Sequence, residues 1–159
     1  MEQEKLAKWL KVIIIGIAVC GIFIYAFLIP GYGEMIVHDY PEFAYCYTPW
    51  LIFITLTAVP CYIALFFAWK IFTNIGKDNS FSKDNAKYLK WISWLAAGDA
   101  AYFFIGNVVL FFLGMNHPGI FLYSLIVVFA GIAISVAAAA LSHLVLKAAL
   151  LQEESDLTV

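Results

Sequence analysis

Four long apolar runs separated by polar segments constrain this chain more than any other feature. The first, from Val12 to Ile29, is close to the ~20 residues that a helix needs to cross ~30 Å of hydrocarbon. With 64% hydrophobic residues and a mean hydropathy of +0.90, the chain is too apolar for a soluble domain. The sequence therefore predicts an integral membrane protein. Because the first run lacks a clear cleavage site before Pro30, we expect it to be retained as a span.

The lysines indicate how the chain is oriented. Five of the nine lie in the polar segment 70–90, and the others lie near the N-terminus and at Lys147. The positive-inside rule then places this segment and both termini in the cytoplasm. The chain has no Arg, so it lacks the bidentate donors on which direct nucleic-acid binding usually depends.

These observations predict an all-α membrane protein that forms a single four-helix transmembrane bundle. We expect four spans, at about residues 9–29, 50–72, 87–113 and 119–147. The other segments are an outer loop at 30–49, a cytoplasmic loop at 73–86 and an acidic tail at 148–159. The outer loop is rich in aromatic residues and should lie on the membrane surface, as a short helix or hairpin. Pro60 should kink the second span, and the tail should extend the last helix by a turn or two.

The cytoplasmic loop carries signals for a turn followed by a helix. We expect a turn at 76–79, an N-cap at Ser82 and a favourable charge from Asp84 in the first helical turn. Lysines then recur on one helical face. The segment is either an amphipathic turn at the membrane interface or a docking surface for a cytoplasmic partner, anchored by Phe81.

Asp99 is the most informative single residue, because an ionisable side chain inside a span costs about 2.5–3.5 kcal/mol on insertion scales. At ~1.5 Å per residue it lies level with Cys61 and Ala138. The polar residues that we consider as its partners are Tyr62, Tyr102, Asn107, Ser135, Ser142 and, if the helices are offset by a turn, His143. Asp99 is then either a structural residue that locks the last two spans together or a switch that responds to a proton or ligand.

Small residues form a stripe on the last span. Gly131, Ser135 and Ala139 recur every four residues, and Ser142 and His143 continue the stripe. Such a face lets helices approach closely in a bilayer. It also offers a surface for a homo-oligomer.

Motifs for catalysis or metal binding are weak. No nucleophile elbow accompanies the serines, His143 and Asp99, so a hydrolase is not expected. Four outer residues could in principle hold a divalent ion, namely His38, Asp39, Glu42 and His117, but their spacing fits no metal motif and a solvated loop is the preferred interpretation. We expect no enzyme, no metal and no cofactor.

Two segments, residues 76–89 and 152–159, resemble a bacterial family of short four-span membrane proteins of unknown function that includes YoaS-type proteins. The family has a central Gly-x-x-Phe-Ser-x-x-Asn-x-x-x-Leu pattern and an acidic tail ending in Asp or Glu, Leu, Thr and Ile or Val. The pattern falls on Gly76, Phe81, Ser82, Asn85 and Leu89 in the loop, and on Glu154, Asp156, Leu157 and Thr158 in the tail. This loop has two extra residues before Phe81, and Lys where relatives often have Arg.

The resemblance implies a partner in the cytoplasm, because members of the family are often encoded beside a small helix-turn-helix transcription regulator. We therefore predict a non-enzymatic sensor or anchor whose two motif segments bind such a partner. The alternative is a small transporter, or a transporter subunit, that uses Asp99 as an intramembrane carboxylate.

Overall fold

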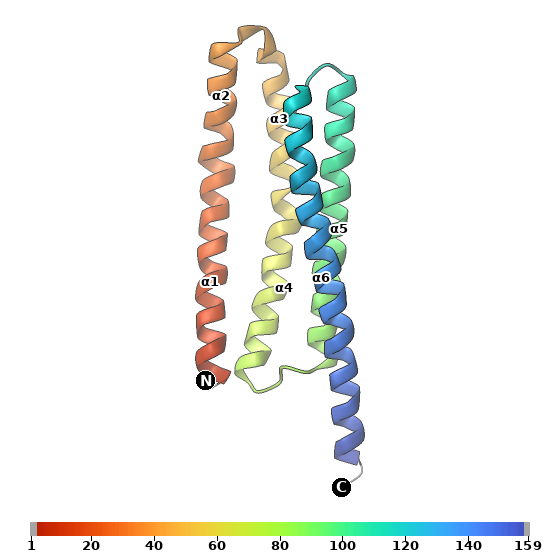
Figure 1. The fold of residues 1–159 in the computed structure, drawn as a ribbon. Helices are drawn as coiled ribbons and strands as arrows, with labels where there is room; N and C mark the ends of the chain where they lie inside the picture. The colour runs from red at the N-terminus through yellow and green to blue at the C-terminus, as the bar shows by residue number, and fades with distance from the viewer. Residues whose placement is uncertain (1–2, 158–159) are drawn as a thin grey trace.

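The structure, a computed structural model, describes residues 3–157, which form four long helical rods joined by short turns (Figure 1). These residues contain no strand. Each rod contains a candidate span of 30 to 38 residues that is apolar enough to cross a membrane. The prediction of an all-α chain with four membrane-spanning helices is confirmed.

The first rod continues past Pro30, where we expected it to end. It consists of three successive helical segments, α1 (Gln3–Phe23), a π-helical turn (Ile24–Leu28) and α2 (Ile29–Asp39). A proline inside a helix removes one hydrogen bond and crowds the preceding turn. Here the wide π turn lies just before the proline, and the Ile29 N–H donates to the Ile24 carbonyl five residues back. This local widening accommodates Pro30, so the helix is not interrupted.

The second rod is interrupted once, at Thr57. Its segments are a 3-10 turn (Pro41–Phe43), α3 (Ala44–Leu56) and α4 (Ala58–Gly76). The hydroxyl and the N–H of Thr57 both donate to the Ile54 carbonyl, at 2.6 and 3.0 Å. Pro60 has no N–H to bond the Leu56 carbonyl, so the disruption expected from this proline lies at the turn just before it.

Residues 30–49 are mostly helical where we expected a loop. The first rod ends at Asp39 and the second begins at Pro41, so the chain reverses at Tyr40. Pro49 lies inside α3. The aromatic residues of this segment therefore belong to two adjoining helix ends.

The third and fourth rods, α5 (Lys83–Phe112) and α6 (Pro118–Leu157), form an antiparallel hairpin, as predicted. Gly114 closes α5 with a positive φ of 71°. Its N–H donates to the Phe111 carbonyl, and the Met115 N–H donates to the Leu110 carbonyl. Glycine suits this left-handed position because a side chain there would be strained.

The face of α6 that packs on α5 has a spacing of three and four residues. Between positions 121 and 145 the residues that are not exposed are Phe121, Ser124, Val128, Gly131, Ser135, Ala138, Ser142 and Val145. This heptad-like spacing is that of antiparallel helices crossing at a small angle. Ala139 and His143 are exposed, so the four-residue stripe drawn from the sequence is wrong at these two positions.

The small residues of this face serve contacts within the chain. A Cβ atom placed on Gly131 would lie 3.0 Å from the Cβ of Ala100, so glycine is what allows α5 and α6 to approach there. Ser142 donates to the Ala86 carbonyl at 2.7 Å. The face that we expected to be available for a homo-oligomer is therefore covered by α5, and an oligomer would have to use another surface.

The rods pack in chain order, with α4 between α1 and α5 and with α6 against α5 (Figure 1). Both ends of the described chain and the linker 77–82 lie at one end of the bundle, which we call the terminal end. The turn at Tyr40 and the linker 113–117 lie at the opposite, far end. At the terminal end α6 projects beyond the other helices. It remains helical to Leu157, so the polar tail from Gln152 extends the helix by six residues, within the turn or two expected.

Candidate functional sites in the helix bundle

The linker 77–82 begins with a tight cap on α4. The Asp78 N–H donates to the Ile75 carbonyl and the Asn79 N–H to the Asn74 carbonyl, both at 3.0–3.1 Å. Asp78 adopts a φ of 58°, a left-handed conformation that aspartate tolerates better than most residues. The expected turn is present, and it satisfies two carbonyls at the end of α4.

Asn85, in the first turn of α5, fixes the linker through hydrogen bonds of its side chain. It is only 1% exposed, and its side-chain oxygen accepts from Asn74 Nδ2 at 2.8 Å. Its own Nδ2 donates to the carbonyls of Asn79 and Ser80, at 3.2 and 3.0 Å. The Asn85 N–H donates to Ser82 Oγ, which confirms Ser82 as the N-cap of α5. These two residues of the predicted binding motif are used inside the linker and give it its shape.

Phe81 is the motif residue that the linker presents outward, with 57% of its surface exposed. Gly76 instead contacts the first helix, since a Cβ on it would lie 3.0 Å from the Cβ of Ala7. Leu89 is half-buried on α5. The loop motif therefore combines one exposed aromatic ring with residues that support its position.

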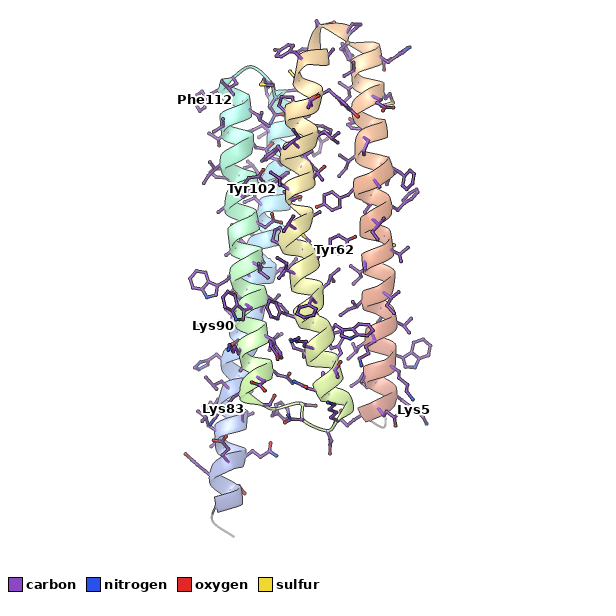
Figure 2. All side chains as sticks on the ribbon, turned by 180° about the vertical axis from the view of Figure 1, so that it is seen from behind. Lys5, Tyr62, Lys83, Lys90, Tyr102 and Phe112 are labelled. Atoms are coloured by element: carbon purple, nitrogen blue, oxygen red, sulfur yellow. The ribbon has the colours of Figure 1, made fainter. Side chains whose placement is uncertain are left out.

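The acidic tail lies beside the start of α5. Lys83 Nζ pairs with Glu153 Oε2 at 2.8 Å, and both side chains are about half exposed (56% and 54%). Figure 2 shows Lys83 at the terminal end, where α5 begins. Glu154 is exposed on the same helix, Asp156 and Leu157 are its last described residues, and Thr158 lies outside the described residues. The loop and the tail, distant in sequence, thus meet in space.

Asp99 lies on α5 and faces α4. Cys61 Sγ donates to its Oδ2 at 3.7 Å, which confirms that these two residues lie at the same level. The other carboxyl oxygen, Oδ1, is buried and has no hydrogen-bond partner within residues 3–157. An unsatisfied buried acceptor costs about 1–3 kcal/mol, so Asp99 is an exception to the usual pairing of buried polar atoms.

The residues that we considered as donors to Asp99 make other hydrogen bonds. Tyr62 donates to the Ala18 carbonyl at 2.7 Å, between α4 and α1 (Figure 2). Ser135 donates to the Ser93 carbonyl at 2.9 Å. The remaining donors are also engaged elsewhere, Ser142 with Ala86, Tyr102 with Phe53, and Asn107 with Phe103 and Asn116. A shared polar face made by Asp99, Tyr102 and Asn107 is therefore not formed.

The histidines do not assemble a site. His143 is exposed on α6 and makes no hydrogen bond within the described residues. His38 contacts the neighbouring Asp39 at 3.3 Å, and His117 Nδ1 accepts from the Gly119 N–H at 3.0 Å. Across residues 3–157 no group of three or more His, Cys, Asp or Glu side chains could hold a metal ion, and this includes the outer set with Glu42.

A cavity of about 530 Å³ at the far end was not predicted from the sequence. It lies between the tips of the two hairpins, and its walls include Tyr40, Phe43, Tyr47, Trp50, Met115 and His117. The aromatic density of residues 40–50 was visible in the sequence, but we assigned it to the membrane surface. Only the approach of the 113–117 linker shows that these rings line a space between the hairpin tips.

The four helices that are long and apolar enough to cross a bilayer define a multi-pass helical membrane protein. The chain belongs to the family described as "Protein of unknown function (DUF2975)", whose model matches residues 32–159. It is 31% identical over 152 residues to the uncharacterized membrane protein YoaS of Bacillus subtilis (strain 168), with 94% of each chain covered. The family recognised from the loop and tail motifs is thereby confirmed. No solved structure matches the chain.

Proposed function

We propose that this protein is a non-enzymatic membrane sensor or anchor that binds a cytoplasmic protein through the surface formed by the linker 77–82 and the tail. The observation that carries the proposal is the Lys83–Glu153 ion pair, which brings the two family motifs into one surface. Motif segments separated by more than sixty residues of sequence have a common role most simply if one partner contacts both.

The chemistry of this surface supports a protein partner. Phe81 offers an exposed aromatic ring, and anchors of this kind carry much of the affinity in peptide and helix recognition. Two residues along the chain, Lys83 of α5 pairs with Glu153 of α6, and such exposed charges can direct the orientation of a partner. The α6 helix projects past the linker (Figure 1), so a partner could contact both the linker and the side of α6.

The orientation of the chain is part of the proposal. The lysines gather at the terminal end, so the positive-inside rule favours a cytoplasmic location for this end and for both termini. A helix-turn-helix regulator is the partner that the family resemblance favours. The protein would then hold a transcription regulator at the membrane and need no basic patch of its own.

A pull-down from mildly solubilised membranes tests this function. Four forms are compared: the intact chain, a chain lacking residues 152–159, Phe81→Ala, and Phe112→Ala as a matched control. Phe112 is 83% exposed but lies at the far end. The proposal expects a DNA-binding protein with the intact chain and the control, and its loss with the other two variants. Capture that is equal from all four forms would refute it.

A second function, transport, is favoured by Asp99 alone. A buried carboxyl oxygen without a partner inside a span is a typical feature of proton and ion pathways. Proton flux into liposomes that contain the protein and a pH-sensitive dye tests this alternative, with Asp99→Asn compared with Asp84→Asn at the exposed start of α5. A flux that Asp99→Asn leaves unchanged would remove the support for transport.

A further inference from the structure

We propose that the far-end cavity binds an uncharged, lipid-soluble molecule that has an apolar body and a hydrogen-bond-accepting carbonyl. This binding site shares no residue with the proposed partner surface or with Asp99. Its volume of about 530 Å³ falls within the range of roughly 300–1,000 Å³ that is usual for small-molecule sites.

The second rod is interrupted at Thr57, below the far-end cavity. Beyond this break, Phe53 of α3 lies over Gly106 of α5, so closely that a Cβ on this glycine would overlap the ring. The Phe53 ring also stacks on that of Phe103, with centroids 5.6 Å apart. This contact holds the two hairpins together below the far end, and above it the hairpin tips line the cavity.

Tightly packed rings form one wall. Gly33 is buried, and a Cβ placed on it would lie 2.7 Å from the Tyr47 ring and 3.4 Å from the Trp50 ring. The rings therefore rest on the backbone of α2 and cannot collapse further toward it. A wall fixed in this way is preformed, which lowers the cost of ordering the site when a ligand binds.

The lack of charged side chains in the lining favours an uncharged ligand. No Asp, Glu or Lys lines the cavity, so a charged molecule would enter without an ion-pair partner. The walls are mostly aromatic and aliphatic, which favours an apolar body. The lining residues adjoin the ends of the spans predicted from the sequence, so we expect a lipid-soluble molecule to reach the cavity from the bilayer.

Three polar side chains of the lining can donate a hydrogen bond to a ligand. His117 Nδ1 accepts from the Gly119 N–H, so a neutral His117 ring carries its proton on Nε2 and offers an N–H. The hydroxyls of Tyr40 and Tyr47 can also donate. Asn116 is already tied to Asn107, by Nδ2 donating at 3.0 Å. A carbonyl oxygen is the ligand group that matches free donors in an otherwise apolar space.

Prodan, an uncharged naphthalene ketone whose emission shifts to the blue in apolar sites, is a suitable probe. The protein is placed in lipid nanodiscs, and protein-dependent, saturable Prodan binding is measured against empty nanodiscs. Val37→Trp puts an indole into the cavity and should abolish this binding. Val19→Trp makes the same change on an exposed part of the same rod and should not. His117→Ala should weaken binding by roughly 2- to 10-fold, the effect of one neutral hydrogen bond.

The Val37 and His117 variants could lose binding because they misfold. A second experiment therefore measures ligand binding by chemical labelling, in a chain whose cavity residues are all unchanged. Cys46 is buried and lines the cavity. In a Cys20→Ala, Cys61→Ala chain it is the only thiol, and its alkylation by N-ethylmaleimide should slow at least 5-fold when Prodan is present. The proposal is overturned if saturable binding is absent, if Val37→Trp binds like Val19→Trp, or if Prodan does not protect Cys46.

Discussion

Replacing Asn85 by Ala should open the linker at the terminal end. The side chain makes three hydrogen bonds, one accepted from Asn74 and two donated to the carbonyls of Asn79 and Ser80. A net worth of about 0.5–1.5 kcal/mol for each bond gives a total loss of about 1.5–4.5 kcal/mol. At about 1.4 kcal/mol per tenfold change, the equilibrium for local opening should rise by roughly 10- to 1,000-fold.

Amide hydrogen exchange followed by mass spectrometry measures this opening. Peptides that cover residues 74–90 should lose protection in the Asn85→Ala variant, while those from the far-end linker 113–117 should keep theirs. Asn79→Ala is the matched control. Its side chain is exposed, and the hydrogen bonds made by Asn79 use only its backbone. If both variants exchange within threefold of the unmodified chain, the assignment of Asn85 as the residue that holds the linker is refuted.

Three further changes test the packing between helices. Gly106→Ala should destabilise the protein by about 1–3 kcal/mol, because the ring packed on this glycine must move, whereas Gly98→Ala, with open space around it, should be neutral or slightly stabilising in thermal unfolding. Gly131→Leu should separate α5 from α6 and lower the unfolding temperature, and the exposed Ala139→Leu should not; equal effects would contradict the heptad-like face. Tyr62→Phe should cost about 1 kcal/mol through loss of its hydrogen bond to α1, and an unchanged unfolding temperature would contradict that role.

Features set by local sequence could be predicted from it. The four spans follow from the length and apolarity of four runs. The Ser82 N-cap follows from a serine placed before a helical pattern, and the turn before it from 76–79. Each depends on neighbours within a few residues, which the sequence contains directly.

The partners of Asp99 could not be predicted, because depth along a helix does not give rotation about its axis. The rise per residue placed Asp99 level with both Cys61 on α4 and Ala138 on α6, and the structure turns it toward Cys61. The serines of α6 lie on the α5 side but bond to backbone carbonyls of α5. Choosing between two neighbouring helices required the packing of the whole bundle.

The helical conformation of residues 30–49 escaped prediction for a different reason. Pro30 and Gly31 are ordinarily signs that a helix ends, and only a non-standard turn before them reverses that expectation. The cavity was not predicted for the same reason, because the helix ends formed by residues 30–49 make up part of its walls. Because we expected the first helix to end at Pro30, the sequence did not predict the cavity between the two hairpins.

The uninterrupted course of α6 has a mechanical consequence. One stiff helix of 40 residues begins at Pro118, which lines the far-end cavity, passes the start of α5 at Glu153 and ends at Leu157. At ~1.5 Å per residue it is a beam of ~60 Å, about twice the thickness of the hydrocarbon layer. Pivoting such a beam by ~10° about its midpoint carries each tip through ~5 Å, in opposite directions. A movement of one tip would therefore displace the other as well, and it would have to rearrange the contacts of α6 with α5, such as the hydrogen bonds of Ser135 and Ser142.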